Sequence, residues 1–186
     1  MNKCLLCQSM IFLGVLWNPE PALAIDTWFS GGYELQQSTA EKDLGYGALS
    51  ASLGLKTGYW AYGLHSTFSD TLDFNRVGFN EKQSLDSYSI DIKYYPLDII
   101  RIIAVGLRFG LSKQRIEKTN YGLLDKTDVN WSRVFAPMLE IDLPLGRHLT
   151  AGVTGTYQYH IPMSDSFDLG EAQKFFTANF FGRFWF

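Results

Sequence analysis

The run FFTANFFGRFWF, residues 175–186, ends the chain with two very different sets of alternating positions. One set contains Phe176, Ala178, Phe180, Gly182, Phe184 and Phe186, and the other contains Thr177, Asn179 and Arg183. Because successive side chains of a strand point to opposite faces, this pattern predicts a β-strand with one wholly apolar face. In a soluble sheet that face would pack on a core, whereas in a membrane barrel it would meet lipid. The rest of the chain decides between the two.

The other end of the chain has the features of a secretory signal peptide. Residues 1–3 carry a basic charge, residues 4–17 are apolar, and Ala-Leu-Ala at 22–24 has the small-x-small pattern of a cleavage site. The apolar stretch is shorter than the roughly 20 residues that a membrane-spanning helix needs. The sequence therefore predicts a cleaved signal peptide at 1–24 and a single mature domain at 25–186.

Cysteine content and charge narrow the chemistry of the mature chain. Cys4 and Cys7 both lie in the leader, so the mature chain has no thiol, disulfide or cysteine metal site. Removing the leader takes away Lys3 and Glu20, so the net charge stays at -3. That charge argues against a nucleic-acid partner. The acidic residues lack the spacing of a calcium loop, and we expect no metal and no cofactor.

Eight segments of the mature chain alternate between apolar and polar residues, and none favours a helix. The expected strands are 27–37, 45–56, 59–69, 87–95, 101–115, 128–143, 148–160 and the terminal run. Tight turns are expected at 56–58, 96–100 and 144–147, and long polar loops at 37–44, 70–86, 118–127 and 161–173. Short turns alternating with long loops are typical of outer-membrane barrels, where the short turns are periplasmic. The sequence predicts an all-β fold, an eight-stranded antiparallel up-and-down transmembrane β-barrel with both termini periplasmic.

Aromatic residues on the expected outer face fall at two heights. The lower set is Phe29, Trp60, Tyr62, Tyr94, Phe184 and Phe186, and the upper set is Phe68, Tyr88, Trp131, Tyr157, Tyr159 and Phe176. Two such girdles suit the boundaries between headgroups and hydrocarbon. A periplasmic or secreted β-sandwich also alternates, but it has no reason to place so many rings on its outer face.

The signal peptide, the eight strands, the segment SIDIKYYPLD at 89–98 and the aromatic C-terminal strand resemble a known family. This is the family of small outer-membrane β-barrels, the class of outer-membrane protein X and of the transmembrane domain of outer-membrane protein A. The resemblance implies an integral, monomeric protein of the Gram-negative outer membrane. It also implies that Phe180, Phe184 and Phe186 form a signal for the barrel assembly machinery.

The expected interior of the barrel is rich in charge. Its inward-facing ionisable residues are Glu34, His65, Asp91, Lys93, Arg108, Glu140, Asp142 and Arg183. Opposite charges in so narrow a lumen predict salt bridges that plug it, and the alternative is a porin-like ion or proton path. Four further inward residues, Tyr46, Tyr95, Met138 and Trp185, take up room and favour the plug.

No catalytic residue is predicted, although lipid A-modifying enzymes share this barrel. A deacylase needs a His and a Ser two residues apart, both facing lipid. Here His65 and Ser66 are adjacent, and Thr67, two residues after His65, faces the lumen. His160 and Ser164 lie at a loop edge, where folding could bring them together.

The sequence therefore favours a structural or surface-interacting role through the extracellular loops, whose ligand it does not name. The alternatives are a lipid A acyltransferase or deacylase, or a narrow ion channel.

A lipopolysaccharide site is predicted from three outward cations, Lys113, Arg115 and Arg133, beside Trp131. At about 3.3 Å per residue and a tilt near 40°, Arg133 stands roughly 28 Å above the turn at Pro144, the height of outer-leaflet headgroups. Arg can bind phosphate bidentately, and Lys acts as a point charge. The alternative is that the three are snorkelling rim residues without a fixed ligand.

Overall fold

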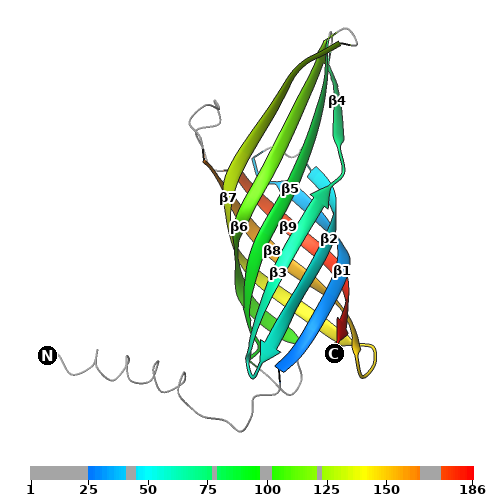
Figure 1. The fold of residues 1–186 in the computed structure, drawn as a ribbon, viewed down its shortest axis with the longest axis vertical. Helices are drawn as coiled ribbons and strands as arrows, with labels where there is room; N and C mark the ends of the chain where they lie inside the picture. Colours follow the sequence, from blue (N-terminus) through cyan, green and yellow to red (C-terminus); the bar gives the residue numbers. More distant parts are fainter. Residues whose placement is uncertain (1–24, 41–44, 77–78, 97–101, 121–122, 164–172) are drawn as a thin grey trace, which may run out of the picture.

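The structure is a computed structural model, and it describes residues 25–40, 45–76, 79–96, 102–120, 123–163 and 173–186 (Figure 1). The expected signal peptide lies outside these residues. Within them nine strands form: β1 (Ile25–Ser38), β2 (Gly45–Thr57), β3 (Trp60–Ser69), β4 (Leu72–Arg76), β5 (Phe79–Tyr94), β6 (Ile103–Asn120), β7 (Leu123–Pro144), β8 (Leu149–Pro162) and β9 (Gln173–Trp185). No helix in the described parts of the chain is long and apolar enough to cross a membrane.

Eight of the strands form a closed antiparallel ring in chain order. The pairing runs β3-β2-β1-β9-β8-β7-β6-β5, and β3 also pairs with β5, which closes the barrel. The first and last strands pair along their length, so the terminal run lies beside β1. Closure matters because it leaves no strand of the ring with an unpaired edge. The predicted eight-stranded up-and-down barrel is confirmed.

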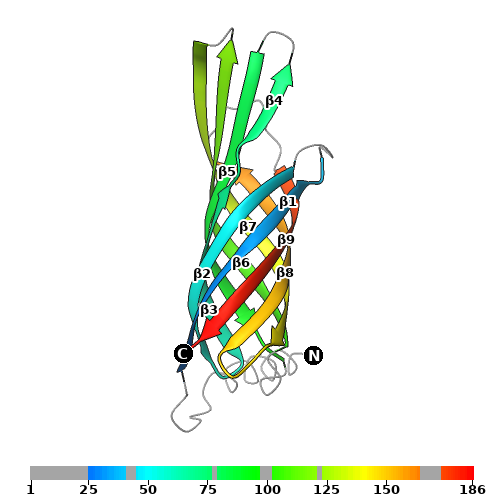
Figure 2. The same ribbon diagram turned by 90° about the vertical axis from the view of Figure 1, so that its right-hand side faces the viewer.

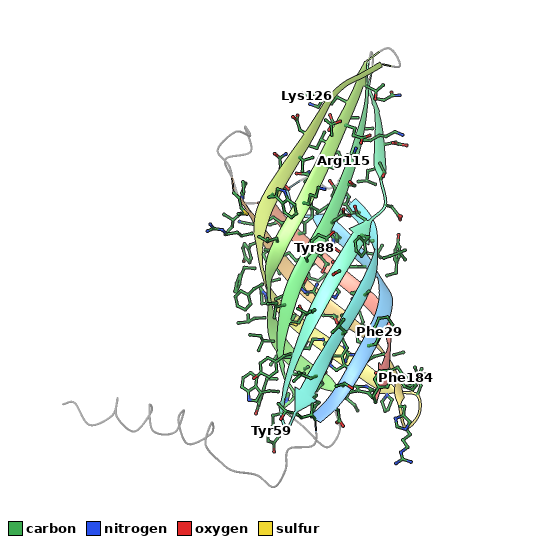
Figure 3. All side chains as sticks on the ribbon, in the orientation of Figure 1. Phe29, Tyr59, Tyr88, Arg115, Lys126 and Phe184 are labelled. Atoms are coloured by element: carbon green, nitrogen blue, oxygen red, sulfur yellow. The ribbon has the colours of Figure 1, made fainter. Side chains whose placement is uncertain are left out.

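The outer face of the ring is apolar, as the alternation predicts. Figure 3 shows the side chains that project outward around the barrel, with Phe29, Tyr88 and Phe184 labelled among them. These three are 53%, 44% and 45% exposed, while their chain neighbours Ser30, Ser87 and Arg183 are buried inside.

The turn after β2 contains Gly58, whose positive φ of 54° suits glycine.

The prediction of long loops at residues 70–86 and 118–127 is wrong. Residues 70–86 and 118–127 contain β4, the first half of β5 and the ends of β6 and β7. Pairing continues from Tyr94↔Val105 to Phe79↔Asn120 between β5 and β6, far beyond the expected strand ends. β4 is a ninth strand outside the ring, and it pairs with β5.

These extensions form a four-stranded sheet that stands above one end of the ring (Figure 2). We call it the protruding sheet and define it as β4 with residues 79–86, 113–120 and 123–131. Here β5 no longer pairs with β3, and β7 no longer pairs with β8. The outer face above the ring is largely polar, so the apolar outer face that marks a barrel strand disappears from the sequence although backbone pairing goes on. We call this end of the barrel the upper end.

Candidate functional site

All eight predicted luminal residues lie inside the barrel and are buried. Their ion pairs divide them into two clusters at different heights. The upper cluster contains Glu34, His65, Asp91 and Arg108, and the lower cluster contains Lys93, Glu140, Asp142 and Arg183. Strand counting from the sequence gives the same division, because it places the first four residues near mid-height and the other four lower.

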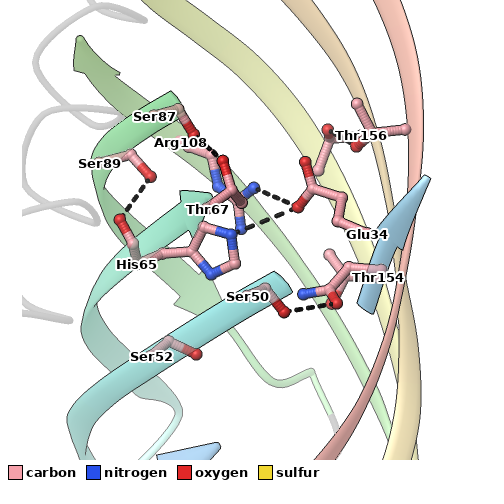
Figure 4. Close-up of polar contacts among 12 residues, drawn as sticks. Glu34, Ser50, Ser52, His65, Thr67, Ser87, Ser89, Arg108, Thr154 and Thr156 are labelled. Atoms are coloured by element: carbon pink, nitrogen blue, oxygen red, sulfur yellow. Dashed lines mark hydrogen bonds and ion pairs between the residues drawn. The ribbon is translucent and has the colours of Figure 1, made fainter. Parts of the chain in front are cut away.

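Arg108 is the centre of the upper cluster (Figure 4). It donates from Nε to Asp91 Oδ1 at 2.8 Å and from Nη2 to Asp91 Oδ2 at 3.0 Å, a bidentate pair between directly opposed residues of β5 and β6. Its Nη1 also reaches Glu34 Oε2, on β1, at 3.5 Å. Since β1 and β6 do not pair, this last contact crosses the lumen. His65 Nε2 lies 3.3 Å from the same Glu34 oxygen.

The lower cluster is built around Glu140. Lys93 Nζ donates to its Oε2 at 2.6 Å, Thr154 Oγ1 donates to the same oxygen at 2.9 Å, and Arg183 Nη1 lies 2.8 Å from its Oε1. Arg183 also pairs with Asp142. Two cations and two carboxylates from three strands, β5, β7 and β9, therefore fill the lower lumen.

Trp28 packs against the cations of the lower cluster. Its ring lies 4.6 Å from the Arg183 guanidinium and 5.0 Å from Lys93 Nζ. Behind it, Gly54 and Gly63 leave the space that the indole occupies, because a Cβ at these positions would lie 2.6 Å and 2.8 Å from ring atoms. The glycines of β2 and β3 thus make room for a Trp inside a barrel of this width.

A hydrophobic cap covers the luminal charges at the upper end. It consists of the buried residues Tyr46, Leu85 and Phe175, with Leu72 and Phe74 of β4 packed against them. At the lower end Tyr95 packs with Ala61 and Ala104, and its hydroxyl donates to Glu140 at 3.1 Å. The predicted inward residues Tyr46, Tyr95, Met138 and Trp185 are all buried.

We expect planar-bilayer recordings of the purified protein to show no steady conductance. An ion pair crosses the lumen, and packed hydrophobic clusters lie at both ends of it. Large, ohmic openings of the unmodified protein would contradict the plug and favour the channel.

His160 does not lie at a loop edge, as the sequence suggested, but inside the upper barrel, 2% exposed. Ser112 Oγ is 2.9 Å from its Nδ1, and its Nε2 is 2.9 Å from Gln158 Oε1. Because an amide oxygen only accepts, Nε2 carries the proton of the neutral ring and Ser112 donates to Nδ1. Gln158 in turn donates to Glu34 at 3.3 Å, so this chain joins the upper cluster.

The pairing of Ser112 with His160 was missed from the sequence, because the two residues belong to strands without a shared motif. A Ser–His pair can act in nucleophilic catalysis, but Ser112 is 1% exposed and the His160 ring packs on Phe175, with centroids 4.9 Å apart. Ser164 lies outside the described residues. Among the described residues no group of three or more His, Cys, Asp or Glu could hold a metal ion.

The three cations of the predicted lipopolysaccharide site lie outside the barrel at its upper end, but not as one group. Lys113 lies 6.0 Å from the centroid of the Trp131 ring, and Arg133 is exposed on the neighbouring strand. Arg115 Nη2 instead pairs with Glu117 at 2.6 Å on the protruding sheet. Figure 3 shows Arg115 above the level of Tyr88.

A closed eight-stranded barrel with an apolar outer face and a polar, plugged lumen defines the class of small outer-membrane barrels. Several solved structures share this fold, and three of them are compared with this chain below. Ail, the attachment invasion locus protein of Yersinia pestis, has a TM-score of 0.62 and 11% identity, over 87% of this chain and 98% of Ail. A major outer membrane protein from Thermus thermophilus has a TM-score of 0.58 and 14% identity, over 88% of this chain and 100% of that protein. Neisserial surface protein A has a TM-score of 0.54 and 11% identity, over 90% of this chain and 100% of that protein.

No family model matches the sequence, and no curated protein matches it either. At identities this low the three structures share the fold with this chain, and the fold alone does not assign a role.

Proposed function

We propose that this chain is a monomeric, integral protein of the bacterial outer membrane that contacts molecules outside the cell through its protruding sheet. The signal peptide would direct it to the envelope, the short turns and both termini would face the periplasm, and the sheet would be extracellular. The observation that carries the proposal is the contrast between a filled lumen and a large, ordered sheet above it. A structural plug needs no such sheet.

The charges on the protruding sheet are balanced. Its exposed ion pairs are Lys82–Asp73 at 3.9 Å, Arg115–Glu117 at 2.6 Å, Lys118–Glu81 at 3.8 Å and Lys126–Asp128 at 3.0 Å. Asp86 and Lys113, which face each other across β5 and β6, add one charge of each sign. Such a surface favours neither a polyanion nor a polycation as partner. Ail has been crystallised with the heparin analogue sucrose octasulfate, and the balanced sheet of this chain gives no reason to expect the same ligand.

The edges of the protruding sheet suit a protein partner. In the described residues β4 pairs only with β5, and residues 123–130 of β7 pair only with β6. Unpaired N–H and C=O groups at such edges can accept an extended segment of another chain. Polar side chains on the sheet would then supply selectivity.

We expect a variant that lacks residues 73–82 and 116–127, each replaced by a short turn, to lose surface contacts but keep its barrel. Unheated samples of both proteins should still migrate faster on a gel than boiled ones, because the ring is untouched. Adhesion of bacteria that produce the variant to a cultured epithelial monolayer, and to one another, should fall several-fold. The matched control is Asp73→Asn with Lys82→Gln, which keeps the sheet and removes only one weak ion pair.

Equal adhesion of the shortened and full-length proteins would contradict the proposal.

Mass analysis of lipid A from cells with and without the protein should show no change in acyl pattern, and a change would favour the lipid A-modifying alternative instead.

Three partner assignments belong to the same proposal. The exposed phenylalanines Phe180 and Phe184 on the outer face of β9, together with Phe186 directly after this strand, would be read by the barrel assembly machinery. Outer-membrane lipid would cover the apolar outer face, and lipopolysaccharide would lie against the cations at the upper end.

A further inference from the structure

One long edge of the protruding sheet has no strand partner among the described residues. Residues 123–130 of β7 pair with β6 on one side, and β7 pairs with β8 only from Ser132 onward. Figure 1 shows β7 along one side of this sheet and β4 along the other. β4 is a short strand, Leu72–Arg76, and its Leu72 and Phe74 pack on the hydrophobic cap. The edge of β7 is therefore the longer template for another strand.

Opposite charges lie symmetrically about Thr127 on this edge. Lys126 and Asp128 flank Thr127 and point to the same face of β7, where Lys126 Nζ lies 3.0 Å from Asp128 Oδ2. Their side chains are 67% and 24% exposed. The register with β6 shifts between Leu124 and Lys126, so the regular part of the free edge begins at Lys126.

A closed two-fold pairing of two copies through this edge is antiparallel. One residue then faces its own copy, and every other residue faces the one at the same distance on the opposite side of the centre. A centre at Asp128 would place two carboxylates face to face, and a centre at Lys126 would do the same with two ammonium groups. A centre at Thr127 instead places Lys126 of each copy opposite Asp128 of the other, on the same face.

We propose that the protruding sheet binds a second copy of this chain, edge to edge through β7 and centred on Thr127. The two sheets join into one continuous sheet, and Lys126 and Asp128 of each copy gain an oppositely charged partner on the other. Because the paired strands are antiparallel, the two barrels point in opposite directions. The second copy therefore stands in a membrane that faces the first.

The position in a facing membrane rests on the proposed function, which places the sheet outside the cell, whereas the pairing of the edges does not. Each contact is short, since the regular free edge covers only residues 126–130. Many copies on each of two facing surfaces act together, and linked weak contacts give an avidity far above that of one contact. The partner is thus another cell that carries the same protein.

Disulfide trapping tests the register of this pairing. The mature chain expected from the sequence has no cysteine, so Thr127→Cys introduces a single thiol. Directly opposed residues have Cβ atoms about 4.5 to 5.5 Å apart, close enough for a disulfide after a small adjustment. Under mild oxidation the detergent-solubilised variant should form a covalent dimer.

The matched control is Val129→Cys, which is exposed on the same face as Thr127. Because Val129 lies two residues from the centre, its two copies are offset along the strand by about 13 Å, too far for a disulfide. This variant should stay monomeric under the same oxidation.

Charge exchange tests the chemistry of the contact. In the Thr127→Cys background, Lys126→Asp gives two acidic flanking positions, and Asp128→Lys gives two basic ones. Either variant alone should cross-link several-fold less than Thr127→Cys, because like charges then face each other twice. A mixture of the two should recover the cross-linking, since each acidic residue then faces a basic one. A size tag on one of them identifies the mixed dimer on a gel.

The same charge variants, without the cysteine, apply to whole cells. Cells that display Lys126→Asp alone or Asp128→Lys alone should stay dispersed, and a mixture of the two populations should aggregate. All variants should keep the difference in gel mobility between unheated and boiled samples, which shows that the barrel is folded.

Equal cross-linking of Thr127→Cys and Val129→Cys, or none by either, would overturn the register. A mixture of charge variants that cross-links no better than its components would overturn the ionic contact. The proposed function is judged by another readout: it fails if the shortened protein adheres to the epithelial monolayer as well as the full-length one, whatever the trapping experiments show.

Discussion

Replacing Arg108 with methionine should lower the free energy of unfolding by about 3 to 5 kcal/mol, because it leaves two buried carboxylates without their cation. Arg108 alone holds Asp91 in a bidentate pair and reaches Glu34 across the lumen. His65 pairs with Glu34 and not with Asp91, so it does not replace Arg108 there. Urea unfolding in lipid vesicles, followed by tryptophan fluorescence, measures the change.

The control for this variant removes the stranded charges as well. Arg108→Met combined with Glu34→Gln and Asp91→Asn should recover a large part of the lost stability, because a neutral polar lumen has no uncompensated charge. If the single and triple variants are equally unstable, the loss comes from packing of the Arg108 side chain and not from the ion pairs. If the single variant is as stable as the unmodified protein, the upper cluster does not hold the barrel together.

The sequence predicted the luminal clusters because two simple rules suffice for them. Alternation fixes which residues of each strand face inward, and counting from the short turns fixes their approximate height. Counted from the turn at 96–100, Asp91 and Arg108 both fall near the middle of their strands. In the structure they are register partners. Contacts across the lumen, such as Glu34 with Arg108, follow once the ring is closed.

The protruding sheet could not be predicted by the same rules. Above the ring the outer face no longer meets lipid, and residues such as Lys82 and Glu117 stand where an apolar residue would be expected. The remaining sequence pattern that indicates strands is on the inner face of this sheet. There Leu72, Phe74 and Leu85 alternate with polar residues and pack on Tyr46 and Phe175. A short apolar alternation inside a polar stretch is weak evidence by itself, since hairpin pairing also depends on partners far along the chain.

The Ser112–His160 pair shows a second kind of contact that the sequence does not predict. Each residue faces inward by parity, as the sequence indicates, but β6 and β8 are separated in the ring by β7. Their contact depends on how far each side chain reaches into the lumen, which neither alternation nor spacing contains.

Replacing Arg183 should destabilise the barrel by a similar amount, but the reason includes the shape of the guanidinium. Arg183 pairs with both Glu140 and Asp142, and its guanidinium lies 4.6 Å from the Trp28 ring and 4.5 Å from the Phe181 ring. Arg183→Met should therefore cost about 3 to 5 kcal/mol. Arg183→Lys should recover only part of this, because an ammonium group is a point charge and cannot bridge two carboxylates while stacking on rings.

A double variant tells the ionic part from the aromatic part. Arg183→Met with Asp142→Asn leaves Lys93 and Glu140 as one balanced pair, 2.6 Å apart, so the electrostatic cost should largely disappear. What remains measures the lost contacts with Trp28 and Phe181, about 0.5 to 2 kcal/mol for interactions of this kind. Full stability of Arg183→Lys would show that charge alone matters in the lower lumen. In that case the stacking of Arg183 on the two rings would have no part in closing the barrel.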